Sequence, residues 1–340
     1  MKRDSIEVFK KLLELINQNQ ESVLVTVIKS AGSTPREKGA RMIVTQTGRI
    51  SGTIGGGTIE YLAEELGKTC LKEKRSCTKD YDLSPNEVAD LGMICGGQVK
   101  LLFQYINPKQ QVLAEVLTQL ITFLETNQHF CFLSSINAEQ APPFLILNDK
   151  NQWPRSEIVS LVKENISKDC KKEKAKYFIE EFSKQGKVYI FGGGHVSQAL
   201  VPILRELDFY CVVLEDREDF LTKDLFPTAN ERMQVDFKAI AEKISPTEKD
   251  YAIVITRSHQ FDYELQKQLL NTPVYYIGVM GSKRKTAIQK ENLKKEGYSP
   301  TDIKRINMPI GINIKAETLK ELAISISAEL ILKRATKNEK

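Results

Sequence analysis

Hydrophobic and polar positions in the first half of the chain follow both helical and strand-like spacing. Residues 1–18 and residues 110–126 place apolar side chains along one face of a helix. Residues 23–29 and 99–106 follow the spacing of β-strands, and the turn Thr47-Gly48 separates two short strand-like segments, as in a hairpin. Helices and strands mixed in this way predict an α+β region.

Two further strand-like segments, residues 130–136 and 143–147, continue this region. Residues from about 156 to 186 are rich in Lys and Glu and show little apolar periodicity, which predicts a solvated helical connector. We therefore expect an N-terminal α+β domain over residues 1–180 that ends in this connector, with its motifs in residues 1–107.

From Lys187 onward, strands alternate with helices. Strands of almost continuous apolar sequence are expected at residues 188–191, 211–214, 251–256 and 274–277. Such alternation predicts a parallel sheet covered by helices on both faces. The expected fold class is α/β, in which the N-terminal α+β domain is followed by a Rossmann-like doubly wound parallel-sheet domain over residues 187–340.

The composition narrows the class of protein. The 340 residues are 41% hydrophobic and 27% charged, which suits a folded chain with two cores. The formal net charge is +5, with Lys and Arg interleaved among Asp and Glu, so no nucleic-acid partner is expected. No apolar run reaches about 18 residues and no signal-peptide cleavage site is visible, so we expect a cytoplasmic protein without membrane association.

The six cysteines show neither a Cys-x-x-Cys pair nor zinc-finger spacing, so we expect reduced thiols and no structural zinc. Five of them are expected to act only as small hydrophobic side chains: Cys70, Cys77, Cys131, Cys170 and Cys211. Cys95 differs, because the adjacent Gly96 and Gly97 leave its sulfur accessible and backbone amides can stabilise a thiolate. A thiolate suits a soft or thiophilic metal centre, although a single loop cysteine is more often inert.

A glycine-rich loop follows the first strand of the C-terminal domain. An apolar strand that leads into glycines and then a helix is the context of a dinucleotide-binding turn. Gly192 permits the tight turn, and Gly194 lets a phosphate approach the backbone at the start of the helix. Ser197 replaces the third glycine of the motif. The alternatives are a Rossmann fold without a dinucleotide and, for His195, an ordinary loop position.

Polar residues also follow the later strands of this domain. Asp216, next to Glu215, has the spacing of a ribose-binding carboxylate, and His259 lies at the sheet edge where ligands of open α/β folds bind. A second turn offers Ser282 as a helix N-cap and places Arg284 between two lysines in the first helical turn. The helix dipole disfavours cations there, so a bound anion would relieve the conflict, and a solvated basic face is the alternative.

Two loops of the N-terminal domain are dense in glycine, hydroxyl groups and arginine. Gly55, Gly56 and Gly57 precede a helix and can present adjacent N–H groups to an anion. Arg36, in the other loop, can bind a phosphate with two hydrogen bonds. We therefore expect a pocket for a phosphorylated ligand, the alternative being that the glycines only permit tight turns.

In these motifs the sequence resembles the XdhC/CoxI family, which includes PucA-type accessory proteins for xanthine dehydrogenase. The resemblance rests on GSTPREKGARMIV with GTIGGGTIE, on MICGGQV, and on FGGGHVSQAL through PIGINIKAETLKELAISISAELI. Their occurrence in this order is far more specific than any one of them. Roughly residues 108 to 186 carry no recognisable motif.

The resemblance implies a protein that binds molybdenum cofactor (molybdopterin), protects its sulfurated form and delivers it to a xanthine dehydrogenase-type molybdenum hydroxylase of purine metabolism. It implies the hydroxylase and a cysteine desulfurase as partners. Whether the protein forms a homodimer is left open by the sequence. It assigns Cys95 to the family's Cys-Gly-Gly motif and Gly192, Gly194 and His195 to its Gly-x-Gly-His motif.

Further correspondences place Asp216-Arg217 at the family's acidic strand end and His259 at its second histidine, whereas Thr256-Arg257 replaces the usual Thr-His. A maturation factor without catalytic residues is therefore expected. The competing hypothesis is an NAD(P)-dependent oxidoreductase that uses Asp216, with His259 or His195 as acid and base. A scaffold that only docks partners is a third. The glycine loops and Cys95 favour the accessory protein, because a plain dehydrogenase has no use for them.

Overall fold

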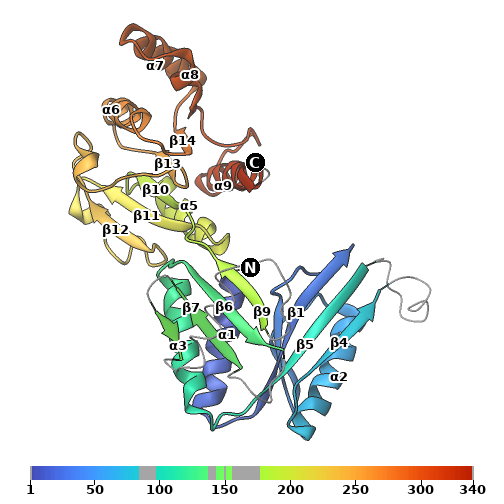
Figure 1. The fold of residues 1–340 in the computed structure, drawn as a ribbon. Helices are drawn as coiled ribbons and strands as arrows, with labels where there is room; N and C mark the ends of the chain where they lie inside the picture. The colour runs from blue at the N-terminus through green and yellow to red at the C-terminus, as the bar shows by residue number, and fades with distance from the viewer. Residues whose placement is uncertain (1, 84–96, 137–142, 149–150, 155–176, 339–340) are drawn as a thin grey trace. The chain divides into compact units, whose positions relative to one another are not determined.

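The chain folds into two compact units, Met1–Lys184 and Gln185–Lys340 (Figure 1). The structure, a computed structural model, describes residues 2–83, 97–136, 143–148, 151–154 and 177–338. None of the described helices is both long and apolar enough to cross a bilayer.

The first unit contains two antiparallel sheets. The larger one has five strands in the order β3-β2-β1-β5-β4. They are β1 (Ser22–Gly32), β2 (Arg41–Thr45), β3 (Gly48–Gly52), β4 (Cys77–Asp82) and β5 (Gly97–Ile106). The smaller one has four strands in the order β8-β7-β6-β9. They are β6 (Phe130–Ser135), β7 (Phe144–Leu147), β8 (Gln152–Trp153) and β9 (Tyr177–Phe182).

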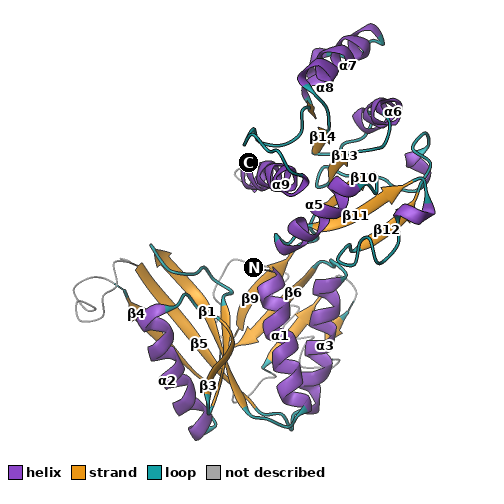
Figure 2. Cartoon of the chain, turned by 180° about the vertical axis from the view of Figure 1, so that it is seen from behind, coloured by secondary structure: helices purple, strands orange, loops and turns teal. Residues whose placement is uncertain are grey.

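Three helices occur in the described part of this unit: α1 (Lys2–Asn17), α2 (Gly57–Glu73) and α3 (Gln111–Glu125). Helix α2 packs on one face of the larger sheet, against Val23 and Val25 of β1. Helices α1 and α3 lie side by side and form a second core with Leu24 of β1 and with Phe130 and Phe132 of β6 (Figure 2). Alternate residues of β1 therefore enter different cores, as the strand repeat requires.

Strand β9 corrects one expectation from the sequence. A helical connector is predicted over residues 156–186, but Tyr177–Phe182 forms a strand antiparallel to β6. Phe182 stacks on Phe130 with ring centroids 4.9 Å apart, and Ile179 packs on the other face of the sheet. The prediction is wrong here because strand pairing and aromatic packing outweigh the local Lys and Glu composition. Residues 155–176 lie outside the described part of the chain.

The second unit is built on a six-stranded sheet in the order β12-β11-β10-β13-β14-β15, and all neighbouring strands are parallel. Its strands are β10 (Lys187–Phe191), β11 (Tyr210–Glu215), β12 (Glu231–Gln234), β13 (Tyr251–Val254), β14 (Tyr276–Val279) and β15 (Ile306–Asn307). Counted along the chain from β10, this is the 3-2-1-4-5-6 order of a Rossmann fold.

Helices cover both faces of this sheet. They are α5 (His195–Glu206), α6 (His259–Leu270), α7 (Lys283–Lys295), α8 (Pro300–Lys304) and α9 (Leu319–Asn338), with short 3₁₀ turns at Glu218–Phe220 and Ile240–Glu242. Val188 and Ile190 of β10 enter the core beneath α5 and α9, whereas Tyr189 and Phe191 enter the core beneath α6 and α7. The predicted fold class, an α+β region followed by a doubly wound Rossmann-like domain, is confirmed.

A buried ion pair joins the two sheets of the first unit. The guanidinium of Arg41 on β2 binds the carboxylate of Glu180 on β9, and it donates a second hydrogen bond to the carbonyl oxygen of Gly39 at 2.8 Å. Only 1% of the Arg41 side chain and 15% of the Glu180 side chain are exposed. The guanidinium carbon also lies 5.0 Å from the ring centroid of Phe9. A cation buried this deeply depends on its counter-charge.

Replacing Glu180 by alanine is expected to destabilise the first unit by about 3 kcal/mol, because Arg41 would stay buried without a counter-charge. The neighbouring Glu181 provides a matched control, since its side chain is 60% exposed and pairs with an exposed His129. Glu181→Ala should change the free energy of unfolding by less than about 0.5 kcal/mol. Urea unfolding followed by the fluorescence of Trp153, the single tryptophan, measures both. Equal effects of the two variants would contradict this role of Glu180.

Candidate functional site

In the second unit, polar residues singled out by the sequence gather at the carboxyl ends of two neighbouring strands. Strand β10 leads through Gly192–Gly194 into α5, whose first residue is His195. The adjacent strand β13 leads through Thr256–Ser258 into α6, whose first residue is His259. Both histidines are exposed. The strand order reverses between β10 and β13, and open α/β sheets bind ligands at such a reversal.

The three glycines of the turn after β10 meet different constraints. Gly192 has a φ of 112°, and a Cβ atom added to it would lie 2.2 Å from the carbonyl oxygen of Ile255. A Cβ atom on Gly193 would lie 2.4 Å from the carbonyl oxygen of Phe220. At Gly194, by contrast, no described heavy atom lies within 4 Å of the Cβ position. The turn is therefore closed towards the body of the unit and open where α5 begins.

The buried carboxylate of Glu215 holds this turn in place. It lies at the end of β11, and its side chain is 2% exposed. One oxygen accepts a hydrogen bond from the Gly193 N–H at 2.8 Å, and the other accepts from the Arg217 Nε at 3.0 Å and the Arg257 Nη1 at 3.4 Å. Because a buried carboxylate needs such partners, both arginines are drawn to this edge of the sheet.

Asp216, the predicted ribose ligand, is already paired within the protein. Its carboxylate accepts a hydrogen bond from Arg257, whose guanidinium carbon lies 4.8 Å from the ring centroid of Phe261. The hydrogen bond from Arg257 outweighs the effect of burial and, with help from Glu215, lowers the pKa of Asp216 to about 2. A ribose hydroxyl would therefore compete with Arg257 for this carboxylate.

A second internal network fixes the turn after β13. Asp262, which is 3% exposed, accepts hydrogen bonds from the N–H and the hydroxyl of Thr256 at 3.1 and 2.7 Å, and from the Lys285 ammonium at 2.8 Å. Ser282 caps α7 by accepting from the Lys285 N–H at 3.2 Å, as predicted. The sequence suggests that an anion should offset the cations at the start of α7. For Lys285, this anion is the carboxylate of Asp262. Arg284 is exposed.

In the first unit, the predicted glycine loops meet at one end of β1. Gly55, with a φ of 133°, approaches Pro35 so closely that an added Cβ atom would lie 2.4 Å from the Pro35 Cβ. Gly97 pairs with Gly32 across the strands, and its added Cβ would lie 2.6 Å from the carbonyl oxygen of Ser33. Three motif segments that are remote in sequence therefore lie together at this end of the sheet.

The glycine turn before α2 binds a carboxylate of its own helix. One oxygen of Glu60 accepts hydrogen bonds from the N–H groups of Ile54 and Gly56, both at 3.1 Å, and from the Thr53 hydroxyl. The other oxygen lies 3.2 Å from the Arg49 Nε. Burial acts to raise the pKa of Glu60, but these hydrogen bonds outweigh it and the pKa is lowered. A phosphate at these amides would have to displace Glu60.

The structure describes only some of the other residues predicted for this site. Arg36 is exposed, and within the described residues its guanidinium forms no hydrogen bond or ion pair. Gly57 begins α2. Cys95 and Gly96 lie outside the described part of the chain. Among the residues that are described, no group of three or more His, Cys, Asp or Glu side chains is placed to hold a metal ion.

Three acidic residues hold these turns, although the sequence reasoning gave none of them this role. Glu60 and Asp262 are each the fourth residue of a helix, and each reaches back to N–H groups of the preceding turn. An acid at that position, where the helix dipole also favours it, is a usable sequence signal. The burial of Glu215 has no such local signal.

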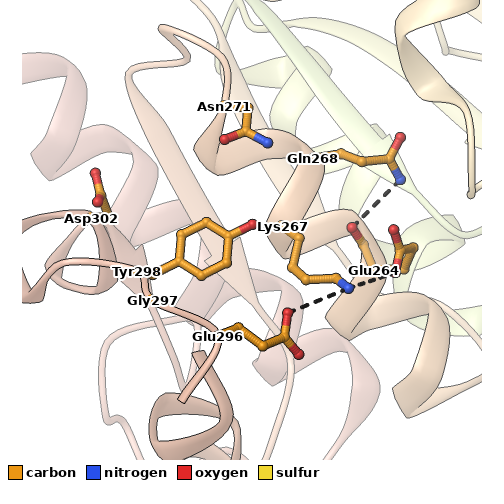
Figure 3. A pocket seen from close by; sticks show the side chains of 8 residues that line it. All are labelled: Glu264, Lys267, Gln268, Asn271, Glu296, Gly297, Tyr298 and Asp302. Carbon is orange, nitrogen blue, oxygen red and sulfur yellow. Dashed lines mark hydrogen bonds and ion pairs between the residues drawn. The ribbon is translucent and has the colours of Figure 1, made fainter. Parts of the chain in front are cut away.

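A pocket of about 460 Å³ lies elsewhere in the second unit, over the C-terminal half of α6 and the turn between α7 and α8 (Figure 3). At its wall the Lys267 ammonium lies 3.1 Å from Glu264 and 3.6 Å from Glu296. None of its eight lining residues is among the predicted site residues. The pocket is therefore separate from the strand ends described above.

The fold and these strand-end residues define a two-unit α/β protein with a Rossmann-type second unit. The profile described as the XdhC Rossmann domain matches residues 188–330, and that of the XdhC and CoxI family matches residues 15–82. The chain belongs to the XdhC and CoxI family, as its motifs predict.

Three relatives are similar along nearly the whole chain. The uncharacterized protein YqeB of Escherichia coli (strain K12) is 22% identical over 96% of this chain, which spans only 46% of the length of YqeB. A probable subunit of xanthine dehydrogenase from Bacillus subtilis (strain 168) is 23% identical, with 94% of this chain and 95% of that one covered. The molybdenum cofactor insertion chaperone PaoD of Escherichia coli (strain K12) is 24% identical, with 99% and 91% covered.

A solved structure is similar across both units. The crystal structure described as a xanthine dehydrogenase from Bacillus halodurans aligns with a TM-score of 0.73 at 26% sequence identity. The alignment covers 98% of this chain and 96% of that chain, so the similarity extends over the full fold.

Arg257→Gln is expected to raise the pKa of Asp216 from about 2 towards its usual 3.8, because the hydrogen bond from Arg257 is the main cause of the lowered value. In the wild type, the stability contributed by ionised Asp216 is present above pH 3.8 and is lost as the pH falls towards 2. The variant should lose this contribution. NMR titration of the aspartate carboxyl carbons measures the pKa, with the exposed Arg284→Gln as control. An unchanged pKa in Arg257→Gln would refute the pairing.

Proposed function

We propose that this protein binds molybdenum cofactor and delivers it to a xanthine dehydrogenase-type hydroxylase, as an accessory protein and not as a catalyst. The observation that carries the proposal is the meeting of three motif segments at one end of β1, marked by the contacts of Gly55 with Pro35 and of Gly97 with Ser33. The family membership and the names of two relatives, one a cofactor insertion chaperone, support it.

The residues at this end of the sheet suit the chemical groups of molybdenum cofactor. Molybdopterin has a phosphate, a polar pterin and a metal dithiolene. The exposed Arg36 is our candidate for the phosphate, because guanidinium groups bind phosphate with two hydrogen bonds. The amides of Ile54 and Gly56 are a weaker candidate, since Glu60 occupies them. Cys95, which precedes Gly97 by two residues, is proposed as the soft ligand that contacts molybdenum.

We also propose that the cofactor is held in its sulfurated form, with a cysteine desulfurase as the source of sulfur. A thiophilic contact from Cys95 would suit a metal centre that carries sulfur ligands. Release to the hydroxylase requires an affinity that is not extreme. A phosphate contact from an exposed side chain such as that of Arg36 fits this requirement.

The second candidate function is an NAD(P)-dependent oxidoreductase, which the strand order of the second unit favours. The open side of the turn at Gly194 can receive a phosphate. The engagement of Asp216 by Arg257 argues against tight binding of a ribose. The purified protein distinguishes the two functions: bound pterin and molybdenum support the accessory protein, and substrate-dependent reduction of NAD supports the enzyme.

Arg36→Ala is expected to weaken the binding of molybdenum cofactor by about tenfold, because a charge-assisted hydrogen bond to phosphate contributes roughly 1.5 kcal/mol or more. Cys95→Ala is expected to retain less molybdenum than the wild type while its pterin binding changes less. Metal analysis of the purified proteins and fluorescence of the released, oxidised pterin measure the two quantities separately.

Matched controls test whether these effects are local. Lys10→Ala removes one exposed cation, which pairs with Glu125, and Cys131→Ala removes a thiol on β6. Both should bind the cofactor as the wild type does. Wild-type retention in Arg36→Ala and Cys95→Ala would remove these residues from the site, and the absence of any cofactor binding by the wild type would refute the proposed function.

A further inference from the structure

Two cysteine thiols of the first unit are in contact. The Sγ atoms of Cys70 and Cys77 lie 3.3 Å apart, although the residues are separated by seven positions and both thiols are free. Cys70 belongs to the last part of α2, and Cys77 is the first residue of β4. The sequence pattern predicts nothing for either residue beyond a small hydrophobic side chain.

Two elements bring these thiols into contact, and each is held in place by its own interactions. Helix α2 ends at Glu73, and the residue that caps it, Lys74, has the left-handed conformation with a φ of 53°. The next N–H, that of Arg75, donates a hydrogen bond to the carbonyl oxygen of Cys70 at 3.1 Å. The chain thereby turns back towards the sheet. Cys77 is then fixed by its pairing with Phe103 of β5, while Cys70 is fully buried in the core beneath α2.

We propose that Cys70 and Cys77 form a reversible disulfide when a low-molecular-weight disulfide such as oxidised glutathione is present. The Cys77 thiolate attacks one sulfur of the small disulfide, which forms a mixed disulfide and releases one glutathione thiolate. The Cys70 thiolate then attacks the Cys77 sulfur, which forms the Cys70–Cys77 bond and releases the second. The two protein thiols lose two electrons, the small disulfide gains them, and the protons end on the released glutathione.

The different exposure of the two thiols sets this order. Cys77 is partly exposed, so a soluble disulfide can reach it, whereas Cys70 is fully buried. Burial and the contact with Cys77 raise the pKa of Cys70 to about 12. Cys70 is therefore a poor first nucleophile, and it acts on a neighbouring sulfur that is already in contact with it. The positive charge of Arg75 opposes the rise in the pKa of Cys70.

The disulfide would link the helix that follows the glycine turn of the candidate site to an edge strand of the sheet on which it packs. Helix α2 begins directly after the glycine turn and carries Glu60, which holds that turn. A bond from Cys70 to Cys77 would fasten the other end of this helix to β4 of the same sheet. Oxidation would then restrict movement of α2 against the sheet, which hydrogen exchange of the α2 amides can report.

The test uses the full chain in mixtures of reduced and oxidised glutathione, quenched by acid and alkylation and analysed by peptide mass spectrometry. The expected product is a peptide pair joined through Cys70 and Cys77, formed in one two-electron transition and fully reversed by dithiothreitol. Cys70→Ala should stop at a Cys77–glutathione mixed disulfide, because the second nucleophile is missing. Cys77→Ser should form neither product.

Cys131→Ser is the matched control and should form the Cys70–Cys77 bond as the wild type does, since Cys131 lies on β6 of the other sheet. Circular dichroism shows whether Cys70→Ala, a change at a buried position, keeps the fold. A wild type in which the two thiols stay reduced in excess oxidised glutathione would overturn the proposal. So would a wild type in which Cys77 carries only glutathione, or one in which either cysteine pairs with a different residue.

Discussion

Backbone N–H groups that point into a folded turn need an acceptor, and both glycine-rich turns of this protein obtain it from a glutamate. The amides of Ile54 and Gly56 donate to Glu60, and the amide of Gly193 donates to Glu215. A buried donor left unpaired costs about 1–3 kcal/mol, so each carboxylate stabilises one conformation of its turn. The turns thus have the geometry of anion-binding sites. In this structure the anion at each turn is a carboxylate of the protein itself, that of Glu60 or that of Glu215.

Because these amides need an internal acceptor, the groups that stabilise a turn differ from the groups that are free to contact a ligand. In the second unit, Gly192 and Gly193 face the body of the protein, whereas Gly194 opens towards the start of α5. The carboxylate of Glu215 also attracts Arg217 and Arg257, so positive side chains are present at the edge while their charge is balanced locally. An incoming phosphate would therefore meet a preorganised backbone and few unpaired cations, which favours modest affinity.

Local sequence patterns predict the four central strands of the second unit, β10, β11, β13 and β14, because these strands are buried on both faces. They do not predict the edge strands, because β12 is only half-buried and β15 has two residues. Ser197, which replaces the third motif glycine, is fully buried in α5, and its hydroxyl has no hydrogen-bond partner within the described residues. The first unit shows the limit of such patterns. Strand β9 lies in a stretch rich in Lys and Glu, and the partner of its Glu180 is Arg41, 139 positions away. Pairing between such distant segments leaves no periodic signal in the sequence.

The sequence predicts the parts of the candidate site in which the backbone conformation requires glycine. It predicts less well which side chains pair with one another. Positive φ angles at Gly55 and Gly192 explain why the sequence keeps glycine there. Two adjacent acids stand at the end of β11, and the sequence alone does not say which one is buried. The point at which the strand ends decides it: Glu215 is the last residue of β11, which is buried on both faces, whereas Asp216 lies just beyond the strand, keeps 21% of its side chain exposed and meets Arg257. A shift of one residue in the end of the strand would exchange the acid that holds the glycine turn for the partly exposed acid that pairs with Arg257.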